Sequence, residues 1–93
     1  MRIIGSIDHP VLKISVFKAD NRISVKFENA LYEQTFEIGE DERFTNLPAV
    51  QKLVDPEMIE DVLTGFSQMH ATRMAVLKRQ FPVSEEETFE EII

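Results

Sequence analysis

Apolar and polar residues alternate along the first forty positions of the chain. Three runs rich in β-branched and aromatic residues, at 11–17, 22–28 and 31–38, are separated by short polar segments. Such alternation is typical of strands that have one buried face and one solvated face. It predicts a three-stranded antiparallel meander, to which residues 2–7 are a candidate fourth strand that Gly5 weakens.

The side chains of these runs suggest how the strands pair. A two-residue turn at Asn29-Ala30 pairs Phe27 with Tyr32, Val25 with Gln34, Ile23 with Phe36, Lys26 with Glu33 and Arg22 with Glu37. A turn at Asp20-Asn21 pairs Ile14 with Phe27, Val16 with Val25 and Lys13 with Glu28. Both registers leave one apolar face and one face of opposite charges, which stabilise each other across strands. Ala30 fits a left-handed turn position poorly, so a wider loop is the alternative.

Two helices are predicted after the strands. Residues 47–54 form a short helix with Thr45 or Asn46 as its cap. Asp55 then precedes Pro56, a capping residue followed by proline at the first helical position. This second helix runs to about residue 79, shortly before a proline at position 82. The fold class is therefore α+β: an antiparallel β-meander of three or four strands, a short helix, and one long amphipathic helix packed on the sheet.

The long helix is longer than the sheet beneath it. At about 100° per residue, an apolar stripe runs through Ile59, Val62, Leu63, Phe66, Leu77 and Phe81, and His70 and Arg73 lie on the same face. A helix of about 25 residues is about 38 Å long, whereas strands of about seven residues span about 23 Å. The helix overhangs its sheet unless Gly65 kinks or breaks it.

A second copy of the chain is the simplest cover for the overhanging half of the stripe. We expect a homodimer whose interface comprises Phe66, Met69, His70, Arg73, Met74 and Leu77. Acids in the first turns and bases in the last turns complement each other in an antiparallel helix pair. They equally complement the dipole of a single helix, so the overhang and not the charge supports the dimer. The leading hypothesis is a non-catalytic interaction or scaffold domain that acts as a homodimer.

The alternative is a small-ligand binding protein or a minor enzyme. Tyr32, Gln34, His70 and Arg73 converge on the layer between sheet and helix, where Arg73 would supply charge for a small anion. The same four residues would also make a satisfied polar network.

Catalytic and metal signatures are weak. The chain has no cysteine and only three glycines, none in a phosphate-binding loop, and no second histidine lies four residues from His70. Asp8-His9-Pro10 is interpreted as a turn, because no nucleophile-elbow glycines flank any serine. We therefore assign no catalytic residue, metal or cofactor, and expect a binding protein more readily than an enzyme.

Charge divides the chain into a nearly neutral body and an acidic tail. The net charge is −7, with 12 acids and 10 bases in residues 1–83 and five acids and no base in residues 84–93. This balance excludes the basic surface of a typical nucleic-acid binder. We expect one α+β domain over residues 1–83 and a tail that either docks on the fold, with Ser84 and Glu87 as a capping box, or binds a protein partner. Lacking a leader or an apolar run near 18 residues, the protein is expected in the cytoplasm and not in a membrane.

Overall fold

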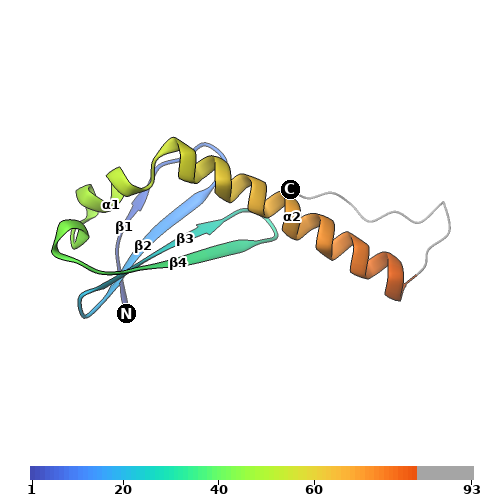
Figure 1. Cartoon of the computed structure of the whole chain (residues 1–93), viewed down its shortest axis with the longest axis horizontal. Helices are drawn as coiled ribbons and strands as arrows, with labels where there is room; N and C mark the ends of the chain where they lie inside the picture. Colours follow the sequence, from blue (N-terminus) through green and yellow to red (C-terminus); the bar gives the residue numbers. More distant parts are fainter. Residues whose placement is uncertain (82–93) are drawn as a thin grey trace.

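The computed structural model describes residues 1–81 and shows an α+β fold. Its elements are β1 (Arg2–Ile7), β2 (Lys13–Ala19), β3 (Arg22–Glu28), β4 (Glu33–Glu40), the 3₁₀ turn η1 (Glu42–Phe44), α1 (Leu47–Leu53) and α2 (Pro56–Gln80). The four strands form one antiparallel sheet in the order β1-β2-β3-β4. Helix α1 and the first half of α2 cover one face of this sheet, and the second half of α2 extends beyond it (Figure 1). The predicted fold class is confirmed.

The candidate fourth strand at residues 2–7 is present as β1. It pairs with β2 through a bulge that leaves Ile4 without a partner in the register. Gly5 follows the bulge at the point where α1 meets the sheet, and a Cβ built on it would lie 2.5 Å from Cδ2 of Leu47. The glycine that weakens β1 as a strand therefore makes room for the first residue of α1.

The predicted register between β2 and β3 is confirmed. Ile14 lies opposite Phe27, Val16 opposite Val25 and Lys13 opposite Glu28. The strands are joined through Asp20, which adopts a left-handed conformation with φ of 56°. Aspartate tolerates that conformation better than most residues, so the Asp20-Asn21 turn can be this tight.

The predicted register between β3 and β4 is wrong by two residues. Phe27 pairs with Gln34, not Tyr32, and Val25 pairs with Phe36. The cause is a wider loop, in which Oδ1 of Asn29 accepts hydrogen bonds from the backbone N–H groups of Leu31 (3.0 Å) and Tyr32 (2.8 Å). This arrangement does not require Ala30 to occupy a two-residue primed turn.

A shift of two residues leaves each side chain on its predicted face, because side chains alternate with a period of two. The expected ion pairs survive as diagonal contacts: Arg22 lies 3.2 Å from Glu37, and Lys26 lies 3.9 Å from Glu33. At the far end the register shifts again between Ile23 and Ser24, so that Ile23 pairs with Gly39 and not with Phe36.

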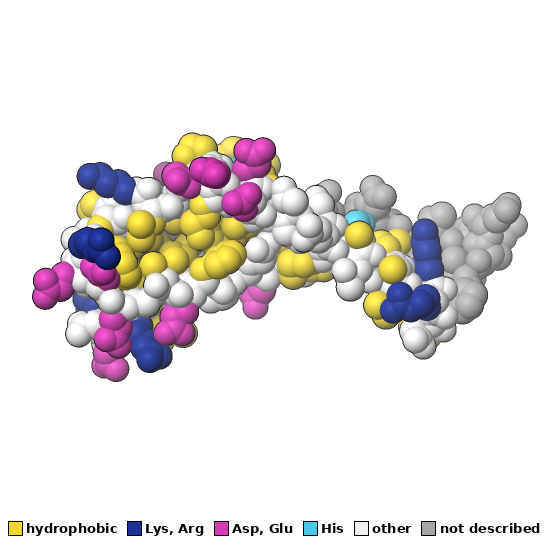
Figure 2. All heavy atoms as spheres, in the orientation of Figure 1, with side chains coloured by type: hydrophobic (Ala, Val, Ile, Leu, Met, Phe, Trp, Pro, Cys, Tyr) yellow, Lys and Arg dark blue, Asp and Glu magenta, His cyan; other side chains and the backbone are white. Residues whose placement is uncertain are grey.

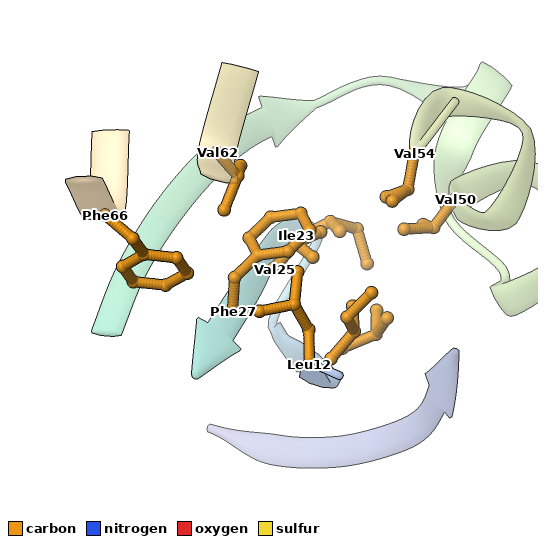
Figure 3. Packing of buried hydrophobic residues seen from close by; sticks show 10 residues of the cluster. Leu12, Ile23, Val25, Phe27, Val50, Val54, Val62 and Phe66 are labelled. Atoms are coloured by element: carbon orange, nitrogen blue, oxygen red, sulfur yellow. The ribbon is translucent and has the colours of Figure 1, made fainter. Parts of the chain in front are cut away.

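The core lies between the inner face of the sheet and the two helices (Figure 3). Ten apolar residues are buried there: Leu12, Ile14, Val16, Ile23, Val25, Phe27, Val50, Val54, Val62 and Phe66. Five of these residues lie on β2 and β3, and Leu12 precedes β2. The helical side supplies the other four: Val50 on α1, Val54 directly after it, and Val62 and Phe66 on α2. Phe66 is the last residue of α2 that is buried in this core.

Both helices begin where capping residues predict. The Asp55 carboxylate accepts a hydrogen bond from the backbone N–H of Met58 at 2.8 Å, and the Asn46 side chain does the same for Ala49 at 2.9 Å. Of the two candidate caps for α1, Asn46 is thus the one used. Helix α2 runs unbroken through Gly65 and ends at Gln80, where the N–H of Phe81 donates to the carbonyl of Leu77. None of the helices in residues 1–81 has the length and apolar character to cross a membrane.

Asp41 caps η1 and should make folding stability depend on acid pH. Its carboxylate accepts bonds from the backbone N–H (2.8 Å), Nε (2.9 Å) and Nη2 (2.7 Å) of Arg43. The guanidinium and the backbone bond lower the pKa of Asp41 from 3.8 to about 2. Because the folded pKa is depressed, the stabilisation is present above pH 3.8 and is lost as pH falls through about 2.

Asp41→Asn should therefore destabilise the fold near neutral pH, and its difference from wild type should shrink steadily below about pH 4. Urea unfolding at several pH values between 7 and 2 would measure this. A difference that stays constant across that range would show that the charge of Asp41 does not contribute.

Candidate functional site

The second half of α2 projects beyond the sheet, as the helix length predicts. We name residues 69–81 the overhang; in Figure 1 it is the orange part of α2, which has no strand beneath it. The described chain is correspondingly elongated, measuring 55 × 24 × 19 Å. The overhang joins the body at a narrow neck in the space-filling view (Figure 2), so its surface is presented apart from the sheet.

The overhang continues the apolar stripe of α2. Met69, His70, Arg73, Met74 and Leu77 are half-buried, whereas Val76 and Phe81 are 38% and 63% exposed. Phe66, which the sequence placed in the same interface, is 1% exposed and belongs to the core of a single chain. A surface formed by α2 therefore begins after Phe66, and Met69, its first residue, still packs partly against the core of its own chain.

His70 is held at the base of the overhang by a tyrosine from the β3–β4 loop. The Tyr32 hydroxyl and Nδ1 of His70 share a hydrogen bond of 3.2 Å, and their rings meet edge to face with centroids 6.1 Å apart. The loop that moved the β3–β4 register is what places Tyr32 there. His70 thus has a partner within its own chain and helps fix the direction in which α2 leaves the body.

Gln34 makes a second link between β4 and α2. Its Nε2 donates to the Val62 carbonyl at 2.9 Å. A Cβ built on Gly65 would lie 2.8 Å from that nitrogen, so glycine leaves the space that the amide fills. Gly65, considered from sequence as a possible break in the helix, instead allows a side chain to reach the helix backbone.

Three of the four predicted ligand residues surround one shallow groove. Tyr32, Gln34 and Arg73 line an open hollow of about 590 Å³ between β4 and the flank of α2. Arg73 makes no ion pair with a carboxylate in the described part of the chain; its Nη1 lies 3.8 Å from Sδ of Met74. The four residues are thus neighbours, but Gln34 is engaged by the helix and His70 by Tyr32, which leaves Arg73 as the group best able to meet an anion.

A second groove was not predicted from the sequence. It has a volume of about 460 Å³, lies on the β1 flank of α2 and is mainly apolar, with Ile7, Val54, Ile59 and Leu63 among its lining residues. His9 stands at its rim, where Nδ1 accepts from the backbone N–H groups of Val11 and Leu12, both at 3.2 Å. Asp8-His9-Pro10 thus lies in the connection between β1 and β2, with the His9 side chain bonded to the backbone that follows it. The available sequence signal for this groove was the position of Leu63 on the apolar stripe of α2.

Comparison with known proteins gives no relative: no protein-family model, no curated protein and no solved structure matches the chain. Within residues 1–81, no three histidine, aspartate or glutamate side chains are grouped so as to hold a metal ion. The function must therefore be argued from the overhang and its adjoining groove.

Proposed function

We propose that this protein is a non-catalytic interaction domain that acts as a homodimer through the overhang. The observation that carries the proposal is the continuation of the α2 stripe through Met74 and Leu77, in the half of the helix that extends beyond the sheet of the same chain. Contiguous apolar surface of this kind is costly in water and usually marks a contact with another molecule. A two-fold dimer covers the same patch on both copies at once.

The charges of α2 do not themselves select the dimer. Acids at positions 55, 57, 60 and 61 lie at the start of the helix, and bases at 73, 78 and 79 lie toward its end. In a dimer through the overhang the acids lie outside the contact, and the bases of the two copies come together. The dimer surface we propose consists of Met69, His70, Arg73, Met74 and Leu77. A cytoplasmic location accords with a chain that has no cysteine to form disulfides.

The solution mass tests the proposal directly. Light scattering across a range of concentrations should give about twice the 10.8 kDa of one chain. A mass of one chain at every concentration would overturn the dimer.

A second candidate function, binding of a small anion, is favoured by the position of Arg73. Its guanidinium borders the groove beside Tyr32 and has no carboxylate partner among residues 1–81. Phosphate and citrate are suitable probes, since carboxylates and phosphates are the natural partners of a guanidinium.

Calorimetric titration with these anions should show binding that Arg73→Ala reduces at least tenfold and that His70→Ala also weakens, with assembly intact. Lys78→Ala removes the same charge outside the groove and should leave binding unchanged. Equal loss in Arg73→Ala and Lys78→Ala would indicate a general charge effect, and absence of binding by the wild type would remove this candidate.

A further inference from the structure

The charged residues of the overhang are all basic. Residues 62–81 contain no acid and three bases, Arg73, Lys78 and Arg79. Two copies packed through this region would bring these positive charges together, and like charges at close range oppose assembly. An acidic neighbour would relieve that repulsion.

The chain carries a segment of matching character directly after the overhang. Residues 84–93 contain five acids, no base and the apolar residues Phe89, Ile92 and Ile93. Residues 82–93 lie outside the described part of the structure, so their predicted capping box and docking also lie outside it. Their composition, however, is complementary to the overhang in both charge and apolar character.

The end of α2 offers an apolar contact for such a segment. Phe81, the last described residue, is 63% exposed, and Val76 is 38% exposed. Lys78 and Arg79 are exposed beside them. Exposed aromatic surface flanked by bases fits a segment that combines glutamates with phenylalanine and isoleucine.

The reach of the tail is sufficient. The 13 residues of the overhang are about 20 Å long as a helix. Ten residues span about 15 Å if helical and up to about 33 Å if extended. A segment of ten residues is therefore long enough to reach the end of the overhang of the same chain.

We infer that residues 84–93 dock on their own chain, along the flank of the overhang that carries Lys78 and Phe81. A segment tethered three residues away has an effective concentration in the millimolar range, which favours its own chain over another. The inference does not require the dimer: the tail occupies the end of the helix around Lys78 and Phe81, one turn beyond Leu77, whereas the second copy occupies the stripe between Met69 and Leu77. In a dimer, the docked tail offsets the positive charge that the two overhangs bring together.

Paramagnetic broadening tests this placement, because the chain has no native cysteine and one label site can be introduced cleanly. A nitroxide on Thr88→Cys, which replaces neither an acid nor an apolar residue of the tail, should reduce the amide signals of residues 69–81 to less than half their intensity at low salt. The signals should recover at about 0.5 M NaCl, where the charges are screened. They should also recover when Lys78→Gln and Arg79→Gln are combined.

Lys13→Gln with Lys52→Gln is the matched control, since it removes two charges from the body and should leave the broadening in place. Repeating the measurement at a protein concentration low enough for the dimer to dissociate separates the two proposals: broadening that persists in the monomer shows docking within one chain. Full signal intensity at low salt, broadening confined to the sheet, or broadening unaffected by loss of Lys78 and Arg79 would each overturn the inference. Broadening lost only on conversion to a monomer would assign the tail to the partner copy and equally overturn it.

Discussion

The double variant His70→Glu, Met74→Glu should be a folded monomer under conditions in which the wild type is a dimer. Burial of one methionine side chain contributes about 1.5 to 3 kcal/mol, and a carboxylate in its place must be desolvated without a designed partner. Across a two-fold interface each substitution occurs twice. The dissociation constant should therefore rise by several orders of magnitude, which light scattering would register as a fall to 10.8 kDa.

Ala71→Glu with Ala75→Glu supplies the control for this measurement. Both alanines are exposed, lie in the same stretch of α2 and face away from the stripe. The control variant adds the same charge and should remain a dimer. Circular dichroism of both variants would confirm that the helix is retained. A dimer that survives His70→Glu, Met74→Glu would place the interface on another surface, and dissociation of the control alone would exclude the stripe.

Phe66→Ala should have the largest effect on the stability of the single chain. Phe66 is 1% exposed, and it is the last side chain of α2 that is fully buried in the core. Truncation of a buried phenylalanine removes its packing and leaves a cavity, at a cost of about 3 to 5 kcal/mol. Domains of about 90 residues are stable by roughly 5 to 14 kcal/mol, so much of the stability would be lost.

Leu63→Ala, about one turn earlier in the same helix, is the matched control, because it also replaces a large apolar side chain by alanine. Leu63 is 39% exposed, so its truncation should cost about 1 kcal/mol. Urea unfolding of the two variants at the same protein concentration would measure how much free energy of unfolding each one loses. Equal losses would mean that α2 is not anchored through Phe66, contrary to the packing in Figure 3.

Much of the fold is predictable from the sequence because its signals are local. Asp55-Pro56 marks the start of α2, and the inward-facing residues of β2 and β3 pair as their alternation predicts. The predicted β3–β4 register is wrong because the register depends on which side-chain atom accepts hydrogen bonds from the backbone N–H groups of the loop. Hydrophobic alternation cannot distinguish registers that differ by two, and only the side-chain bonds of Asn29 decide between them.

The candidate site was predictable in membership but not in bonding. Tyr32, Gln34, His70 and Arg73 do lie close to the junction of β4 and α2, as their faces suggested. What the sequence could not indicate is that the Gln34 amide fills the space left by Gly65, since that contact joins residues far apart in the chain. The sequence predicts Phe66 at the interface because it shares the stripe with Met69. Whether Phe66 is buried in the core or available to a partner depends on where the sheet ends along α2, and the stripe alone does not give that position.

The hydrogen bonds from Gln34 and Tyr32 to α2 set the angle at which the overhang leaves the sheet. From Phe66 to Gln80 the arm is about 21 Å long, so a tilt of about 10° at the anchor displaces its tip by about 4 Å. The two hydrogen bonds, at 2.9 and 3.2 Å, lie close to the point where α2 leaves the sheet, so a small shift there changes the tilt of the whole overhang. Mutations at these two positions, although remote from the tip, would accordingly reorient whatever molecule the overhang carries.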